Sequence, residues 1–154
     1  ITLKKLNKDF TVYATDIVQE TLEVASDNAH YHEVAVTFLK GNALKPFIQN
    51  NIKLDGIVSN PPYIDVDEME MMENTVVKYE PHKALFAENK GFAIYELILN
   101  DLPKVLNKDA YVTFEIGYNQ GERLKNIILE KYPKLDVKVI KDINGNERIV
   151  SFKW

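Results

Sequence analysis

The sequence of 154 residues contains no cysteine, few arginines and no long apolar run. Without cysteine the chain has no disulfide bond, no thiol nucleophile and no cysteine-based zinc site, which is typical of a reducing compartment. Only Arg123 and Arg148 are arginines and the net charge is -4, so a surface that reads duplex nucleic acid is not indicated. No segment is long and apolar enough to span a membrane, and no signal-like segment opens the sequence. We therefore expect a soluble, cytoplasmic protein.

The composition is that of an ordinary globular protein, with 45% hydrophobic and 27% charged residues. This length predicts one compact domain with a real core. The sequence starts at Ile1 within an apolar pattern that has no capping residue before it, so the opening residues resemble the last turns of a helix. We expect that the chain is cut into at this point.

Apolar periodicity predicts strands that alternate with helices. The predicted strands cover residues 10–15, 34–39, 54–59, 111–116, 135–140 and 148–154, and the predicted helices cover 17–29, 92–102 and 120–132. Pro103 limits the second helix, and the Asn144-Gly145 turn joins the last two strands as an antiparallel hairpin. Residues 65–81 are acidic, have no clear period and are predicted to form a long loop or an irregular helix. The sequence thus favours an α/β fold with a mostly parallel sheet.

Ligands of open α/β sheets gather at the carboxyl ends of the strands, and two polar residues follow the first two predicted strands. Asp16 can accept hydrogen bonds from the ribose hydroxyls of a nucleotide cofactor, or it can cap the next helix. Asn42, in a Gly-Asn pair, can meet an adenine amino group or form an ordinary turn. Both interpretations stay open for each residue.

The strongest signal is the tetrapeptide Asn60-Pro61-Pro62-Tyr63, directly after the third predicted strand. The lone pair of an amide or aromatic amino nitrogen is delocalised, so methylating that nitrogen requires both N–H bonds to be held. The side-chain oxygen of Asn60 and the backbone carbonyl of Pro61 can each accept one of these N–H groups. The prolines stiffen the loop and Tyr63 offers a flat apolar wall, so the chemistry rests on positioning. The alternative is a proline-rich turn without a chemical role.

The sequence resembles the release factor glutamine N5-methyltransferase family over nearly its whole length. The residues that carry the resemblance are Asn-Pro-Pro-Tyr-Ile at 60–64, Tyr-Glu-Pro at 79–81, Ala-Leu at 84–85, Gly91, Phe-Glu-Ile-Gly-Tyr at 114–118, Gln-Gly at 120–121, Asp142, Gly145, Glu147 and Arg148. The resemblance implies a Rossmann-like class I methyltransferase fold and S-adenosylmethionine as the methyl donor. It also implies a protein substrate, the glutamine of the Gly-Gly-Gln loop in a peptide chain release factor.

On this basis each candidate residue is assigned a role. We predict Asn60 and Pro61 as catalytic, Asn60, Pro61, Pro62 and Tyr63 as substrate-binding, and Asp16, Asn42 and Asn60 as cofactor-binding residues.

The sequence departs from the family pattern at three places. It contains no Gly-x-Gly, so the glycine-rich cofactor loop and the first strand of the sheet are absent, as is the N-terminal helical domain; Asn42 stands where the family usually has Asp. We therefore expect residues 1–154 to be a partial catalytic domain that is inactive alone. Its sheet would be incomplete, closed by a second chain through an exposed edge, or repaired by direct pairing of the strands that end at Thr15 and Ser59.

Two other functions are compatible with the same motif. An adenine N6-methyltransferase of DNA or RNA would use the same tetrapeptide on a flipped base, although the acidic residues after the motif disfavour a phosphate-rich substrate. A non-catalytic module that binds a partner through the carboxyl edge of the sheet is the second alternative. His30, His32 and His82 lack acidic or cysteine partners at ligand spacing, so no metal site is expected.

Overall fold

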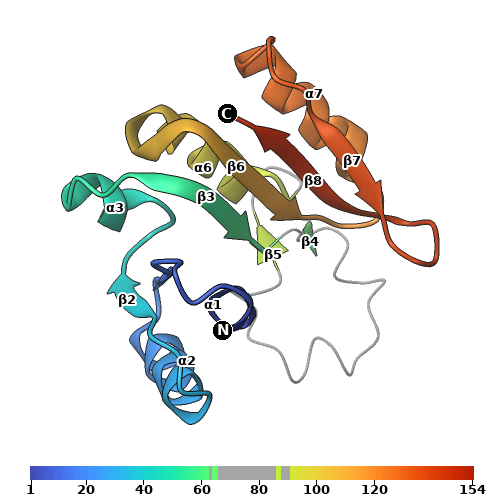
Figure 1. Ribbon diagram of the computed structural model, residues 1–154. Coiled ribbons are helices and arrows are strands. Elements are labelled where there is room, and N and C mark those ends of the chain that lie inside the picture. Colours follow the sequence, from blue (N-terminus) through green and yellow to red (C-terminus); the bar gives the residue numbers. More distant parts are fainter. Residues whose placement is uncertain (63, 66–85, 88–90) are drawn as a thin grey trace. The chain divides into compact units, whose positions relative to one another are not determined.

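The computed structural model describes residues 1–62, 64–65, 86–87 and 91–154 (Figure 1). These residues divide into two compact units, Ile1–Ile52 and Lys53–Trp154. We call them unit 1 and unit 2.

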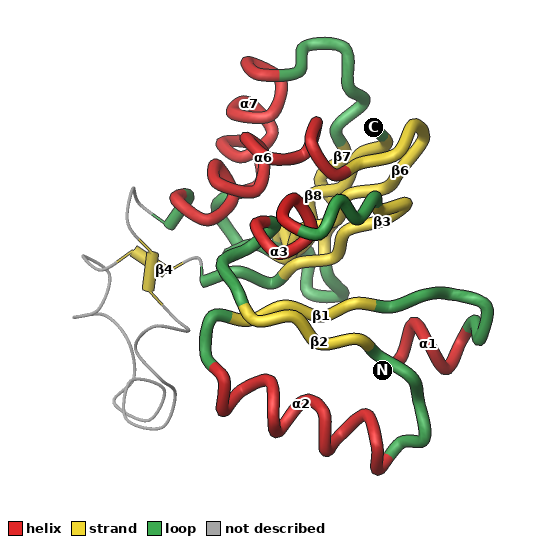
Figure 2. Tube along the Cα trace, turned by 90° about the vertical axis from the view of Figure 1, so that its left-hand side faces the viewer, coloured by secondary structure: helices red, strands yellow, loops and turns green. Residues whose placement is uncertain are grey.

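Unit 1 is built around two short parallel strands. Its elements are α1 (Thr2–Leu6), β1 (Tyr13–Asp16), α2 (Gln19–Tyr31), β2 (Thr37–Lys40) and α3 (Lys45–Gln49). β1 and β2 pair in parallel, with Asp16 opposite Lys40, and α2 connects them along one side (Figure 2). Parallel strands need such a crossover because the chain must return to the same end of the sheet. The crossover therefore brings the carboxyl ends of both strands to one edge.

A small core holds unit 1 together. Its buried apolar side chains are Leu22 and Ala29 of α2, Leu44, and Phe47 of α3. The ring of Tyr13 on β1 meets the ring of Phe47 edge-on, with the centroids 5.8 Å apart. This contact packs α3 against the first strand.

Unit 2 contains a four-stranded sheet in the order β3-β6-β8-β7. Its elements are β3 (Leu54–Ser59), α6 (Ala93–Val105), β6 (Leu106–Glu115), α7 (Gly121–Lys131), β7 (Lys138–Lys141) and β8 (Glu147–Lys153), besides the parallel pair β4 (Ile64–Asp65) and β5 (Phe86–Ala87). β3 and β6 are parallel, whereas β8 runs antiparallel to both β6 and β7. The carboxyl ends of β3 and β6 and the start of β8 therefore lie at one edge of the sheet.

The core of unit 2 is dense and partly aromatic. Tyr95 of α6 and Phe114 of β6 are fully buried, with ring centroids 5.4 Å apart in an edge-on arrangement. The ring centroid of Phe152 on β8 lies 6.3 Å from that of Phe114. Buried aromatic rings contribute both apolar area and directional contacts, so this cluster fixes α6 against the sheet.

The expected α/β class, the parallel pairing and the terminal antiparallel hairpin are confirmed, and β3 has the predicted bounds. Gly145 adopts a positive φ of 84° in the predicted turn. Direct pairing of the strands at Thr15 and Ser59 is wrong, because β1 and β3 belong to separate sheets. The prediction of a partial catalytic domain over 1–154 stays a prediction.

The predicted end of the helix at Pro103 is also wrong, because α6 continues through this residue to Val105. Proline lacks the N–H that would bind the carbonyl oxygen four residues earlier, which is that of Leu99. The Tyr132 hydroxyl donates a 2.7 Å hydrogen bond to this same Leu99 oxygen. A side chain from beyond α7 thus satisfies the acceptor that Pro103 leaves open, and the helix continues.

No described helix combines the length and apolarity needed to cross a membrane.

Candidate functional site

In unit 1, Asp16 ends β1 with a half-buried carboxylate. Its Oδ1 accepts a hydrogen bond of 2.8 Å from the backbone N–H of Val18, the residue before the first turn of α2. Within the described residues, Oδ2 has no hydrogen-bond partner. One oxygen therefore orders the entry to the helix, as the capping interpretation expects in part, while the other stays available to accept from a ligand.

The loop after β2 is held beside this carboxylate. Gly41 donates its N–H to the Asp16 backbone carbonyl at 2.9 Å, and the Thr15 hydroxyl lies 3.3 Å from the Ala43 carbonyl oxygen. A Cβ at Gly41 would lie 2.5 Å from Cγ of Pro46, so only glycine fits at this approach. Asn42 is exposed in this loop. Because Asp16 and Asn42 follow the ends of two parallel strands, both residues lie at the same edge of the sheet, as predicted.

In unit 2, the proline motif begins directly after β3. Asn60 is exposed, Pro61 is buried and Pro62 is half-buried, while Tyr63 lies outside the described residues. Ser59, the last residue of β3, pairs with Phe114 of β6. Because Pro61 is anchored in the interior and Asn60 projects at the surface, the loop combines a fixed backbone with an accessible side-chain amide.

The end of β6 next to this motif is held by side-chain hydrogen bonds to its backbone. The Tyr95 hydroxyl donates to the Glu115 carbonyl at 2.7 Å. The Gln120 side-chain oxygen accepts from the Gly117 N–H at 3.0 Å, and the Gln120 N–H donates to the Gly117 carbonyl at 3.1 Å. The loop between β6 and α7 thus closes on itself.

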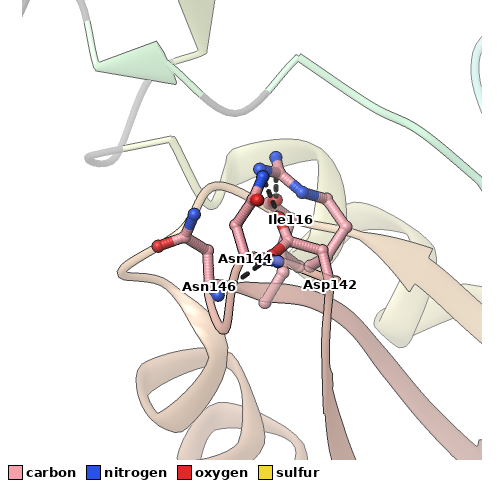
Figure 3. Close-up of polar contacts among 5 residues, drawn as sticks. Ile116, Asp142, Asn144 and Asn146 are labelled. Atoms are coloured by element: carbon pink, nitrogen blue, oxygen red, sulfur yellow. Dashed lines mark hydrogen bonds and ion pairs between the residues drawn. The ribbon is translucent and has the colours of Figure 1, made fainter.

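The β7–β8 hairpin supports the same loop (Figure 3). Asp142 Oδ1 accepts from the N–H groups of Asn144 and Asn146 at 2.9 and 3.0 Å, and its Oδ2 lies 3.3 Å from the Arg148 guanidinium. Partial desolvation alone raises the pKa of Asp142, but the Asn146 and Asn144 N–H groups and Arg148 outweigh it and hold the pKa below its ordinary value of 3.8. Asp142 and Arg148 therefore form an ion pair across the hairpin.

One contact that holds the start of α7 was not predicted from the sequence. Glu147 at the start of β8 accepts a 2.8 Å hydrogen bond from the N–H of Gly121, the first residue of α7. A carboxylate at a helix N-terminus satisfies a free N–H and meets the positive end of the helix dipole. A Cβ at Gly121 would lie 2.6 Å from both Glu147 Oε2 and Val139 Cγ1. The partners are 26 positions apart in the sequence, which leaves no local sequence signal for this contact.

The histidines of the sequence are not gathered into a ligand set where they are described. His30 and His32 are exposed, and His32 Nδ1 lies 3.4 Å from the Lys5 ammonium. No group of three metal-ligating side chains occurs among the described residues. His82 and the motif residues 79–81 lie outside the described residues.

The candidate residues therefore belong to two units. Unit 1 carries Asp16 and Asn42, which suit a ligand with hydroxyl and amino groups, and unit 2 carries Asn60 and Pro61, which present acceptors suited to an N–H₂ group.

Comparison with known proteins shows which family the chain resembles. The model of the methyltransferase small domain family matches residues 1–90. The release factor glutamine methyltransferase of Staphylococcus aureus is 56% identical over 154 residues, and that of Bacillus anthracis is 43% identical over 150 residues. These alignments cover 100% and 97% of this chain but 55% and 53% of the relatives. The chain thus spans about half the length of the curated relatives it matches.

A solved structure gives the same fold. The protein-(glutamine-N5) methyltransferase (release factor-specific) of Alicyclobacillus acidocaldarius superposes with a TM-score of 0.54 at 19% identity. The alignment covers 99% of this chain and 86% of that chain. The described architecture is accordingly that of a class I methyltransferase, as the sequence resemblance implied.

Proposed function

Because the chain belongs to the methyltransferase small domain family, we propose that it carries out methyl transfer to the side-chain amide of a glutamine in a peptide chain release factor. The names of its relatives support this substrate, and the acceptor geometry of unit 2 supports an amide nitrogen as the methyl acceptor. The target is the glutamine of the Gly-Gly-Gln loop.

The observation that carries this proposal is the contrast between Asn60 and Pro61. Asn60 is exposed at the end of β3 and Pro61 is buried beside it, so a side-chain oxygen and a rigid backbone carbonyl follow each other in the chain. Each accepts one N–H of the amide. Holding both N–H bonds turns the nitrogen lone pair toward the incoming carbon and lowers the entropic cost of reaching the reactive geometry. No general base has to act before the new carbon–nitrogen bond forms. The bond from the methyl carbon to the sulfur of the donor would break in the same step and release a neutral thioether, and the methylated nitrogen would then lose one proton to water.

The methyl donor in this proposal is S-adenosylmethionine, whose sulfonium supplies an activated methyl group. The hydrogen-bond acceptors of unit 1 fit such a molecule, because Asp16 Oδ2 has no hydrogen-bond partner within the described residues and can accept from a ligand. The Asp16 carboxylate would accept from the ribose hydroxyls, and the exposed Asn42 amide would accept from the adenine amino group. Asn60 would contact the methyl donor as well as the substrate glutamine.

The test is mass spectrometry of a release factor after incubation with S-adenosylmethionine. Since the chain spans about half the length of its relatives, the enzyme is a chimera in which these 154 residues replace the matching part of the Staphylococcus aureus protein. We expect a gain of one methyl group, mapped to the glutamine of Gly-Gly-Gln. The 154 residues alone are expected to be inactive. Methylation of adenine in added DNA or RNA instead of the release factor would contradict the proposal.

The Asn60→Ala variant of the chimera tests the mechanism. Losing one of the two acceptors should lower kcat by about a hundredfold, as losing one positioned hydrogen-bonding group does in other active sites. The affinity for S-adenosylmethionine should change little. Asn126→Ala, which removes another exposed asparagine from α7, is the matched control and should retain activity. An Asn60→Ala enzyme with wild-type kcat would rule out the assigned role.

A further inference from the structure

The loop between β6 and α7 is buried except at its tip. Ile116, Gly117, Gln120 and Gly121 are buried, whereas Tyr118 and Asn119 at its tip are exposed. The Tyr118 side chain is 68% exposed and has no hydrogen-bond, ionic or ring partner in the part of the chain that the structure describes. An exposed aromatic ring on an otherwise buried loop is typical of a contact residue, because apolar surface is normally placed inside.

The backbone of this loop is held from outside by the first two residues of β8. Arg148 donates from Nη1 to the Ile116 carbonyl at 3.5 Å, while the Ile116 N–H donates to the Arg148 carbonyl at 3.0 Å. Glu147 accepts from the Gly121 N–H at the far end of the loop. Both ends of the segment that carries Tyr118 are therefore tied to the same strand.

Tyr118 also lies at the edge of the sheet that carries Asn60. β3 and β6 are parallel, and Ser59, which precedes Asn60, pairs with Phe114 of β6. Tyr118 follows Phe114 by four residues, beyond the carboxyl end of the same strand. The tip itself, Gly117 to Asn119, carries no charge, and Arg148 is paired with Asp142. Such a surface suits a polypeptide rather than a phosphate backbone.

We propose that Tyr118 is a substrate-contacting residue that binds the polypeptide around the target glutamine, and that Arg148 is the positioning residue that holds its loop. This inference rests on the proposed function, and deepens it by adding a contact for the protein substrate beside Asn60. A tyrosine on an already ordered loop gives a large contact area at little cost in conformational entropy.

The first experiment measures steady-state kinetics and direct binding of the release factor for Tyr118→Ala in the chimera. We expect KM and Kd for the release factor to rise about tenfold, as for a typical aromatic contact at an interface. The KM for S-adenosylmethionine should not change, and Tyr118→Phe should retain most of the affinity. The matched control is Tyr111→Ala, since Tyr111 is 60% exposed toward the other end of β6 and its loss should not affect KM.

The second experiment combines Tyr118→Ala with Arg148→Lys in a double-mutant cycle. Lysine keeps the charge beside Asp142 but lacks the planar pair of donors that also reaches the Ile116 carbonyl. Arg148→Lys alone should raise KM for the release factor several-fold, and it should add little in the Tyr118→Ala background. A purely structural role for Arg148 would give the same loss in both backgrounds and would overturn the positioning part.

The outcomes separate this inference from the proposed function. If the chimera methylates the release factor and Tyr118→Ala leaves KM and Kd unchanged, the inference is wrong and the proposed function stands. If the chimera transfers no methyl group but Tyr118→Ala weakens release factor binding, the contact is supported and the proposed reaction is wrong. Loss of binding to added RNA in place of the release factor would overturn the choice of partner.

Discussion

The two compact units differ in where their large apolar side chains lie. Among the described residues, the ten largest fully buried side chains all belong to unit 2, including Tyr95, Phe114 and Ile128. Unit 1 has fewer buried apolar residues than the described part of unit 2. Phe47 is the only buried aromatic residue of unit 1, and its ring contacts that of Tyr13. Of the thirteen exposed large apolar side chains in the part of the chain that the structure describes, eight belong to unit 1: Ile1, Leu3, Leu6, Phe10, Ile17, Val18, Val24 and Tyr31.

This difference bears on how the candidate residues of each unit are held. The two short strands of unit 1 form a sheet of a size that is marginally stable by itself, and they carry Asp16 and Asn42. Asn60 follows a strand of the four-stranded sheet whose interior is closely packed. Precise placement of a reacting group requires a rigid support, so Asn60 and Pro61, which we propose to bind the amide, lie in the unit with the stronger framework.

The largest expected effect comes from opening the core of unit 2. Phe114→Ala removes a fully buried ring that contacts Tyr95 and Phe152 and should cost about 4–5 kcal/mol in the free energy of unfolding. The matched variant Phe47→Ala, in unit 1, should cost about 3 kcal/mol or less, because a loosely packed site collapses more readily around the cavity. Urea unfolding followed by hydrogen exchange of each unit measures both. Equal costs would remove the difference between the units.

A smaller effect is expected where α7 meets the hairpin. Gly121→Ala places a Cβ against Glu147 Oε2 and Val139 Cγ1 and should cost about 1–2 kcal/mol, since overpacking outweighs the gain in helix propensity. Gly56→Ala is the control, because its Cβ would meet only the Tyr111 carbonyl oxygen at 3.7 Å. The two glycine variants are compared by their urea midpoints, and a destabilised Gly56→Ala with an unaffected Gly121→Ala would contradict this account of the packing.

The smallest expected effect concerns the hairpin ion pair and depends on pH. Folding lowers the pKa of Asp142, so its carboxylate stabilises the folded protein at pH values above the ordinary pKa of 3.8. This contribution is lost as the pH falls through the lower pKa of the folded state. Asp142→Asn should therefore lower the urea midpoint slightly near neutral pH, and the gap should close in acid. Asp136→Asn, at an 85% exposed carboxylate, should show no such gap. A gap for Asp142→Asn that widened in acid would have the wrong sign.

Where the sequence contained local signals, the fold could be predicted from it. β3 ends at Ser59 as expected, because Asn60 and the two prolines stop the strand. The hairpin turn was visible from Asn144-Gly145, and the Asp142–Arg148 pair follows from their short separation across it. Other bounds shifted: the predicted strand 10–15 is observed as Tyr13–Asp16, and 111–116 as Leu106–Glu115. β6 begins earlier than predicted and includes Asp109, which has a φ of 67°; no local pattern indicates this.

What the sequence could not give were contacts between distant segments. The Tyr132 hydroxyl lets α6 pass Pro103 by binding the Leu99 carbonyl, and Glu147 binds the first N–H of α7. Each joins residues that only the folded chain brings together. The assigned roles of Asp16, Asn42, Asn60 and Pro61 stay predictions, although the structure gives each of them a position at the end of a strand.

Glu147 and Arg148 are consecutive residues of one strand, so their side chains leave its backbone on opposite sides. One binds α7 and the other binds Asp142 and the loop of Tyr118. Inserting or deleting a single residue in the turn before them would exchange these sides and break both sets of contacts. Exposed turns usually accept changes in length, but here the contacts of Glu147 and Arg148 require a fixed number of residues between Asp142 and Arg148. Length variation among natural variants of this chain should therefore collect in other loops.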